Sequence, residues 1–128
     1  MTRSTHAVLA QHQILVVEDE YFIAHDIAHA LGRLGAEVIG PAPSCEDALA
    51  LVTAEHLDAA VLDINVRGQS VLPVAEILAA RGVPFVFATG YDRGAVPVAF
   101  RSVPHWEKPF NPDHLARALP EVLPRRRR

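Results

Sequence analysis

The stretch that decides the fold is Ala59-Ala60-Val61-Leu62-Asp63-Ile64-Asn65, a short apolar run that ends on a carboxylate. A run of this length between turn-prone flanks is typical of a fully buried strand in a parallel sheet. The carboxyl ends of such strands lie at the edge of the sheet where ligands bind. The run therefore indicates a site at Asp63, although an Asp at the end of a strand can also serve only to cap a turn.

Outward from this strand, apolar runs alternate with segments of helical periodicity. We predict strands at residues 14–17, 37–40, 59–63, 84–88 and 105–107. Helices are predicted at residues 21–34, 45–55, 73–81 and 112–122, where apolar residues recur at helical spacing. Pro120 should kink or split the last of them. The alternation predicts an α/β fold of three layers, a doubly wound five-stranded parallel sheet with helices on both faces.

The composition is that of a single globular domain. The chain has 128 residues, half of them hydrophobic, and its one cysteine, Cys45, cannot form an intrachain disulfide. This cysteine usage fits the reducing cytoplasm. No apolar run approaches the roughly 20 residues that a transmembrane helix needs, and residues 1–13 do not resemble a signal peptide. We expect a cytoplasmic protein with a flexible tail at 1–12, a domain at 13–124 and a basic tail at 125–128.

The net charge of −3 is unevenly distributed, because four arginines occupy positions 125–128. Without them the chain would carry about −7, and an acidic body argues against a nucleic-acid-binding domain. The arginine tail could contact nucleic acid or an acidic partner. A solvated chain end is the favoured interpretation.

Polar residues follow the carboxyl ends of four predicted strands. Glu18 and Asp19 follow the first strand, Asp63 ends the third, Thr89 follows the fourth and Lys108 follows the fifth. In a doubly wound sheet of order 2-1-3-4-5, strands one and three are neighbours, and ligands bind at the switch point between them. The three carboxylates should therefore converge in one crevice.

These residue types suit one kind of chemistry. Three carboxylates in one crevice repel each other, and a hard divalent cation such as Mg²⁺ relieves the repulsion. The hydroxyl of Thr89 and the ammonium of Lys108 would hold the oxygens of a phosphoryl group. A carboxylate can act as the nucleophile and form an aspartyl-phosphate. Alone, Thr89 would be a loop hydroxyl and Lys108 a solvated charge, but together with the acids they predict Mg²⁺-assisted phosphoryl transfer onto Asp63.

From residue 13 to residue 123 the sequence resembles the receiver domain of bacterial two-component response regulators. The motifs that carry the resemblance are the acidic pair Glu18-Asp19, then Asp63, Thr89 and Lys108-Pro109. The resemblance implies a flavodoxin-like receiver fold and a phosphorelay function. Asp63 would be the phosphoacceptor, and the resulting phosphoprotein would carry its signal as an aspartyl phosphate.

The resemblance also implies a set of metal ligands and one backbone feature. Asp19, Asp63 and the backbone carbonyl of Asn65 would bind Mg²⁺, and Glu18 would act through water. The peptide bond before Pro109 would be cis, a rare conformation.

The chain departs from the common receiver pattern at His105. Most receivers carry Tyr or Phe three residues before the lysine, where a change of rotamer acts as the switch. The run from Pro84 to Tyr91 instead resembles the FAT GUY class of receivers, which lacks that aromatic and carries a Tyr just after Thr-Gly. Tyr91 would then be the switch residue, although an aromatic ring with a polar tip would equally suit the rim of the core.

Receivers normally place a fourth helix in the segment that here runs from Asp92 to Pro104. Thr89 and Lys108 are 19 positions apart, a few fewer than is usual in the family. Gly94 and Pro97 both disfavour a helix. We therefore expect a short or irregular fourth helix.

Two functions are compatible with these residues. The first is a stand-alone receiver that accepts a phosphoryl group from a sensor histidine kinase or a histidine phosphotransfer protein and signals through a downstream protein. It would involve no nucleic-acid-binding domain and no membrane, and no enzymatic activity beyond self-catalysed phosphorylation and autodephosphorylation. The second is a haloacid-dehalogenase-like Mg²⁺-dependent phosphatase with Asp63 as nucleophile. Those enzymes carry a second Asp two residues on, where this chain has Asn65, and the acidic pair would have no role. The receiver is favoured.

Overall fold

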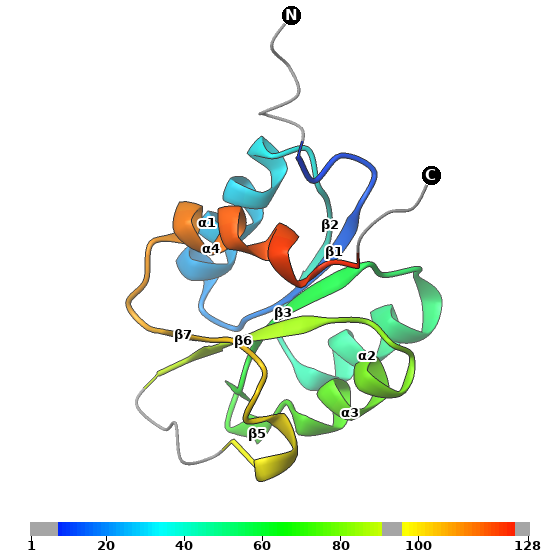
Figure 1. The fold of residues 1–128 in the computed structure, drawn as a ribbon. Helices are drawn as coiled ribbons and strands as arrows, with labels where there is room; N and C mark the ends of the chain where they lie inside the picture. Colours follow the sequence, from blue (N-terminus) through cyan, green and yellow to red (C-terminus); the bar gives the residue numbers. More distant parts are fainter. Residues whose placement is uncertain (1–7, 91–95, 125–128) are drawn as a thin grey trace, which may run out of the picture.

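The computed structural model of the chain describes residues 8–90 and 96–124, with Thr89 described by its backbone. Its centre is a five-stranded parallel sheet in the order β2-β1-β3-β6-β7 (Figure 1). The strands are β1 (Gln13–Val17), β2 (Glu37–Ala42), β3 (Ala59–Asp63), β6 (Phe85–Thr89) and β7 (His105–Glu107). Because β6 and β7 are the predicted fourth and fifth strands, the order 2-1-3-4-5 and the doubly wound α/β fold are confirmed.

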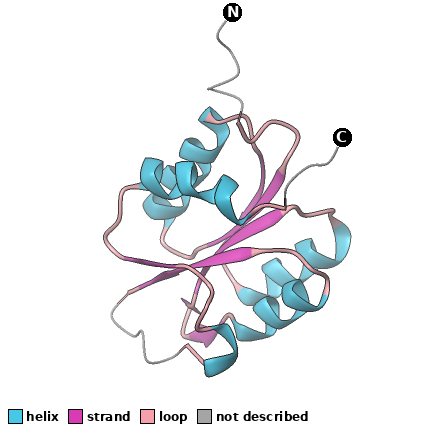
Figure 2. Ribbon diagram, viewed as in Figure 1, coloured by secondary structure: helices cyan, strands magenta, loops and turns pink. Residues whose placement is uncertain are grey.

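Helices cover both faces of the sheet (Figure 2). On one face α1 (Tyr21–Arg33) packs beside α4 (Pro112–Ala118), and on the other α2 (Cys45–Ala54) packs beside α3 (Leu72–Ala80). Neighbouring residues of β1 face opposite layers, since Leu15 belongs to the α2–α3 core and Val16 to the α1–α4 core. Each central strand is therefore apolar on both sides, which explains the unbroken hydrophobic runs in the sequence.

Side-chain caps begin two of the helices. The Ser44 hydroxyl accepts a hydrogen bond from the N–H of Asp47 at 3.1 Å, which caps α2. The Asn111 side chain accepts one from the N–H of Asp113 at 2.8 Å, which caps α4. Such caps satisfy N–H groups that have no partner within the helix.

The last predicted helix is divided. The α-helix α4 ends at Ala118, and the chain continues as the 3₁₀ turn η4 (Leu119–Val122). The break is the predicted effect of Pro120, which has no N–H to continue the α-helical ladder.

The core begins earlier in the chain than expected. The N-terminal tail was predicted to extend to His12, but Leu9 is fully buried against the α1–α4 core, and its N–H donates to the carbonyl of Leu34 at 2.7 Å. Residues 1–7 and the arginine tail at 125–128 lie outside the described residues.

The loop after Asp63 contains a hairpin that the sequence analysis did not predict. Two short antiparallel strands, β4 (Asn65–Val66) and β5 (Gln69–Ser70), are joined by the two-residue turn Arg67-Gly68. Both turn residues have positive φ, +52° and +76°, as in the tight turns that match the twist of a hairpin. Arg-Gly lacks the Asn or Asp that usually marks such a turn in a sequence.

Between β6 and β7, the described residues 96–104 form a single 3₁₀ turn, η3 (Val98–Phe100), and no α-helix. This agrees with the prediction of a short or irregular fourth helix. The ring of Phe100 packs against Phe85 and Phe87, with ring centroids 5.6 and 6.1 Å away. None of the helices in the described part of the chain has the length and apolar character of a transmembrane span.

Candidate functional site

The predicted site residues that the structure describes lie at the carboxyl edge of the sheet, where the strands that precede them end. Asp63 is the last residue of β3, and its exposed fraction is 6%. Glu18 directly follows the neighbouring strand β1, and its exposed fraction is 2%. One carboxylate oxygen from each of Glu18, Asp19 and Asp63 lies within 4.8 Å of the others. The structure thus brings the three predicted carboxylates together.

Lys108 enters the same site from the end of β7. Its Nζ donates to Oδ2 of Asp63 at 3.2 Å and to Oε2 of Glu18 at 3.2 Å. A third bond reaches Oε1 of Glu20 at 3.3 Å. An ammonium has three N–H donors, so each can meet one carboxylate. Only 16% of the Lys108 side chain is exposed, so this cation is partly buried among acids.

The ionisation of the site follows from its burial. Burial, followed by the charge of Asp63, raises the pKa of Glu18 to about 7. Burial also raises the pKa of Asp63, although the ammonium of Lys108 opposes that shift. For Lys108 burial would lower the pKa, but the charges of Asp63 and Glu18 outweigh it and raise the pKa. One ammonium therefore does not compensate the buried acids.

One of the two carboxylate oxygens of Glu18 is buried without a hydrogen bond in the described part of the chain. Its Oε2 accepts bonds from Lys108 and from the N–H of Glu20 at 3.1 Å. Its Oε1 is buried 3.1 Å from Nζ of Lys108 but accepts no hydrogen bond within the described part of the chain. Clustered carboxylate oxygens with surplus negative charge are the donors that Mg²⁺ prefers, so the residues present fit this ion.

The β4–β5 hairpin contacts two of the three carboxylates through its backbone. The N–H of Arg67 donates to Oδ2 of Asp19 at 2.8 Å, and the N–H of Asn65 donates to Oδ1 of Asp63 at 3.3 Å. Sequence reasoning missed Arg67, because the contact depends on an unpredicted hairpin. It also gave no role to Glu20, although Glu20 extends the visible run of three acids Glu18-Asp19-Glu20.

A pocket of about 400 Å³ adjoins the carboxylates between α1 and the end of β2. Glu18, Asp19 and Arg67 form its polar side. The rest of its lining is mainly apolar and comes from Tyr21, Ala24, His25, Ala28, Pro41 and Pro43. A ligand that enters this pocket would therefore meet the carboxylates on one side and an apolar surface on the other.

The remaining predicted residues stand as follows. Thr89 ends β6, one residue beyond Ala88, which pairs with Asp63. The Lys108–Pro109 peptide bond is cis, and so is the unanticipated Gly40–Pro41 bond. Tyr91 lies outside the described residues. The ring of His105 packs at a tilt against Phe87, with ring centroids 5.5 Å apart, so this position is held against the core.

No family model matches the sequence, but individual proteins do. The chain is 45% identical to SdrG from Sphingomonas melonis Fr1, a single-domain receiver, with a TM-score of 0.77 over 87% of this chain and 95% of SdrG. It is 31% identical to the response regulator PhyR from Brucella abortus, with a TM-score of 0.74 over 88% of this chain and 47% of PhyR.

Among curated proteins, the chain is 32% identical over 112 residues to the sensory transduction protein LytT of Bacillus cereus. The match covers 84% of this chain and 45% of LytT, so the chain spans less than half the length of that relative. These relatives are regulators, which does not favour the phosphatase alternative. The sheet order, the site at its carboxyl edge and the likeness to SdrG over nearly its whole length agree, and the chain belongs to the response regulator receiver family.

Proposed function

We propose that the chain is a stand-alone receiver that accepts a phosphoryl group on Asp63 from a sensor histidine kinase or a histidine phosphotransfer protein. The observation that carries this proposal is the bond between Nζ of Lys108 and Oδ2 of Asp63, at 3.2 Å, beside two further acids. It joins a strand-end carboxylate nucleophile to the cation that a transferred phosphoryl group requires.

The transfer is a displacement at phosphorus. A carboxylate oxygen of Asp63 forms the new P–O bond as the P–N bond of the phosphohistidine breaks. The imidazole nitrogen leaves with the electron pair of that bond. Lys108 then exchanges its bond to Asp63 for a bond to a phosphoryl oxygen, and the hydroxyl of Thr89 donates to another. Water later cleaves the acyl phosphate, which returns Asp63 and releases inorganic phosphate.

The site would hold Mg²⁺ through Asp19, Asp63 and the backbone carbonyl of Asn65, with Glu18 acting through water. When bound, the ion supplies positive charge to the phosphoryl oxygens during the transfer. The buried acid cluster supports this set, and so does the Oε1 of Glu18, which has no hydrogen bond in the described structure. Arg67 and Asn65 orient Asp19 and Asp63 through their backbone N–H groups.

Output would proceed by contact with a downstream protein. Tyr91 would respond to phosphorylation in place of the aromatic that His105 replaces, and residues 96–104 would open locally less often. The structure of these residues supports this, because they hold one 3₁₀ turn and pack against the core through Val96, Phe100 and Val103. SdrG, which is similar to this chain, has been solved in a BeF₃-activated conformation.

The test is labelling with a panel of histidine kinases, and with acetyl phosphate and Mg²⁺, followed by mass spectrometry of the intact protein. We expect one phosphoryl group on the wild type and none on Asp63→Asn. Asp26→Asn removes an exposed carboxylate from α1 and should label normally. Full labelling of Asp63→Asn would overturn the proposal. Sustained turnover of a small phosphate ester would favour the phosphatase instead.

A further inference from the structure

The cleft at Asp63 carries an excess of negative charge, which should repel the anionic phosphoryl donor that it is proposed to accept. Three carboxylates, Glu18, Glu20 and Asp63, contact the ammonium of Lys108, and a fourth, Asp19, lies beside Glu18 and Asp63. A phosphoryl donor brings up to about two further negative charges. A divalent ion at the acids offsets only part of this repulsion. A second cation at the mouth of the cleft would therefore change how fast a donor arrives.

Arg67 occupies that position. It lines the pocket of about 400 Å³ together with Glu18 and Asp19, and the residue is exposed. Its backbone N–H is bonded to Asp19 at 2.8 Å, which places the residue at the edge of the acid cluster. Its guanidinium makes no hydrogen bond or ion pair with any described residue, so its donors are available to a ligand.

We propose that the guanidinium of Arg67 receives the incoming phosphoryl donor and draws a dianionic phosphoryl group toward Asp63. This inference rests on the proposed function. The flat fork of donors on an arginine can hold two phosphoryl oxygens at once. Arg67 is thus a binding residue for the donor, whereas Lys108 is partly buried and already bonded to three carboxylates.

The backbone and side-chain roles of Arg67 can be separated by mutation. Arg67 has φ +52°, in the left-handed region that Asn adopts more readily than most residues. Asn-Gly is also a favoured pair for a two-residue hairpin turn. Arg67→Asn should therefore keep the hairpin and the backbone bond to Asp19 while it removes the guanidinium. Arg67→Lys restores the positive charge.

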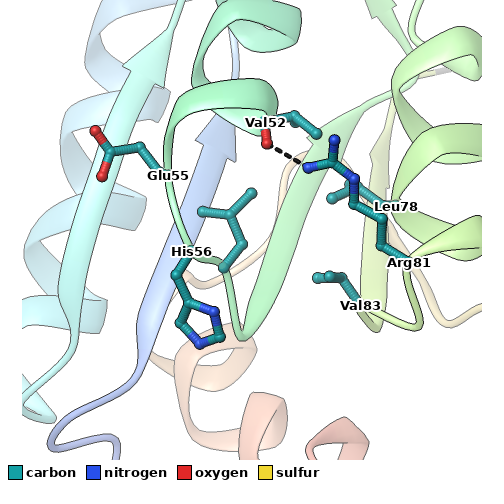
Figure 3. Close-up of a pocket in the computed structure, with 7 residues that line it drawn as sticks. Val52, Glu55, His56, Leu78, Arg81 and Val83 are labelled. Carbon is teal, nitrogen blue, oxygen red and sulfur yellow. Dashed lines mark hydrogen bonds between the residues drawn. The ribbon is translucent and has the colours of Figure 1, made fainter.

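Arg81 provides a matched control at the opposite edge of the sheet. It lines a separate pocket of about 240 Å³ with His56 and Val83, before the amino ends of β3 and β6 (Figure 3). Its guanidinium donates to the carbonyl of Val52 at 2.6 Å (Figure 3). Arg81→Gln removes the same charge as Arg67→Asn, but at a distance of about the length of a strand from the cleft.

The experiment measures the second-order rate at which acetyl phosphate labels Asp63 at saturating Mg²⁺, at low and at high salt. At about 0.03 M ionic strength we expect Arg67→Asn to label about 3- to 10-fold more slowly than the wild type. At about 1 M the screening length is only about 3 Å, and the deficit should shrink below about twofold. Arg81→Gln should stay within about twofold of the wild type at both salt concentrations. Arg67→Lys keeps the charge but not the fork, so it should recover most, but not all, of the rate that Arg67→Asn loses.

Wild-type labelling by Arg67→Asn at low salt would overturn the inference and leave the proposed function intact. A deficit that Arg67→Lys shares, and that high salt does not relieve, would also overturn it, because the effect would then come from the turn. A wild type that takes up no phosphoryl group on Asp63 would overturn the proposed function, and this inference with it.

Discussion

The two loops beside Asp63 are held in place by different forces. After β3, the Asn65–Ser70 hairpin is attached to the site by hydrogen bonds from its backbone to the carboxylates of Asp19 and Asp63. After β6, the described residues 96–104 contain one 3₁₀ turn, held down by aromatic contacts of Phe100. The first loop should therefore respond to charge at the site, and the second to packing on the sheet. In a receiver, the first suits ligand binding and the second suits transmission.

The largest expected effect concerns the charge of Glu18, which lies beside the two carboxylates that hold the first loop. In the metal-free folded protein the pKa of Glu18 is raised from 4.5 to about 7. The folded state then binds more protons than the unfolded state between these values. The stability from this group is full below pH 4.5 and is lost as the pH rises through about 7. The raised pKa of Asp63 acts in the same direction.

Glu18→Gln should abolish most of this pH dependence. At pH 8 in EDTA we expect the variant to be more stable than the wild type, by up to about 3 kcal/mol. At pH 4 the two should be similar, and millimolar Mg²⁺ should narrow the gap at pH 8 by stabilising the wild type. Urea unfolding at both pH values measures this, with the exposed Glu76→Gln on α3 as control. Equal stabilities at pH 8 without metal would contradict the prediction.

A smaller effect is expected from the second loop. Phe100→Ala removes a half-buried ring from its contacts with Phe85 and Phe87 and should cost about 2 kcal/mol. Hydrogen exchange of residues 96–104 should become faster, while stabilisation by Mg²⁺ stays unchanged. Phe100→Leu keeps most of the apolar surface, so its stability and its exchange rate should lie between those of the wild type and of Phe100→Ala. If Phe100→Ala also reduces the stabilisation by Mg²⁺, the two loops are not held independently, and the contrast between them is wrong.

The smallest effect tests the hairpin turn. Gly68 has φ +76°, and a Cβ there would meet no atom within 4 Å, so Gly68→Ala adds backbone strain without a clash. We expect a loss of about 1 kcal/mol. Gly82 follows α3 with φ +73° and the same open surroundings, so Gly82→Ala is a matched control. Only Gly68→Ala should also weaken Mg²⁺ binding, as measured by thermal melting with and without the ion. Equal weakening in both variants would show that the turn does not position Asp19.

Local signals in the sequence were sufficient for the layout of the fold. The strand that ends at Asp63, the caps at Ser44 and Asn111 and the break at Pro120 each depend on residues a few positions apart. The sheet order then follows from the rules for doubly wound folds, and with it the convergence of Glu18, Asp19 and Asp63. The spacing of apolar residues and the capping residues indicate the backbone conformation of a segment, and both depend only on residues close together in the sequence.

Only the tertiary structure decided which hydrogen bonds and ion pairs connect the residues of the site. Lys108 reaches Glu18 across 90 positions, and Arg67 reaches Asp19 across 48. The burial of Leu9 and the Arg67-Gly68 turn were likewise invisible in the sequence. Such contacts depend on how distant elements pack and on which oxygens remain free once they do. The sequence by itself determined that Glu18, Asp19, Asp63 and Lys108 meet at the carboxyl edge. The packing added Glu20 and Arg67 and decided which oxygen each donor reaches, because that choice depends on distances that no local pattern encodes.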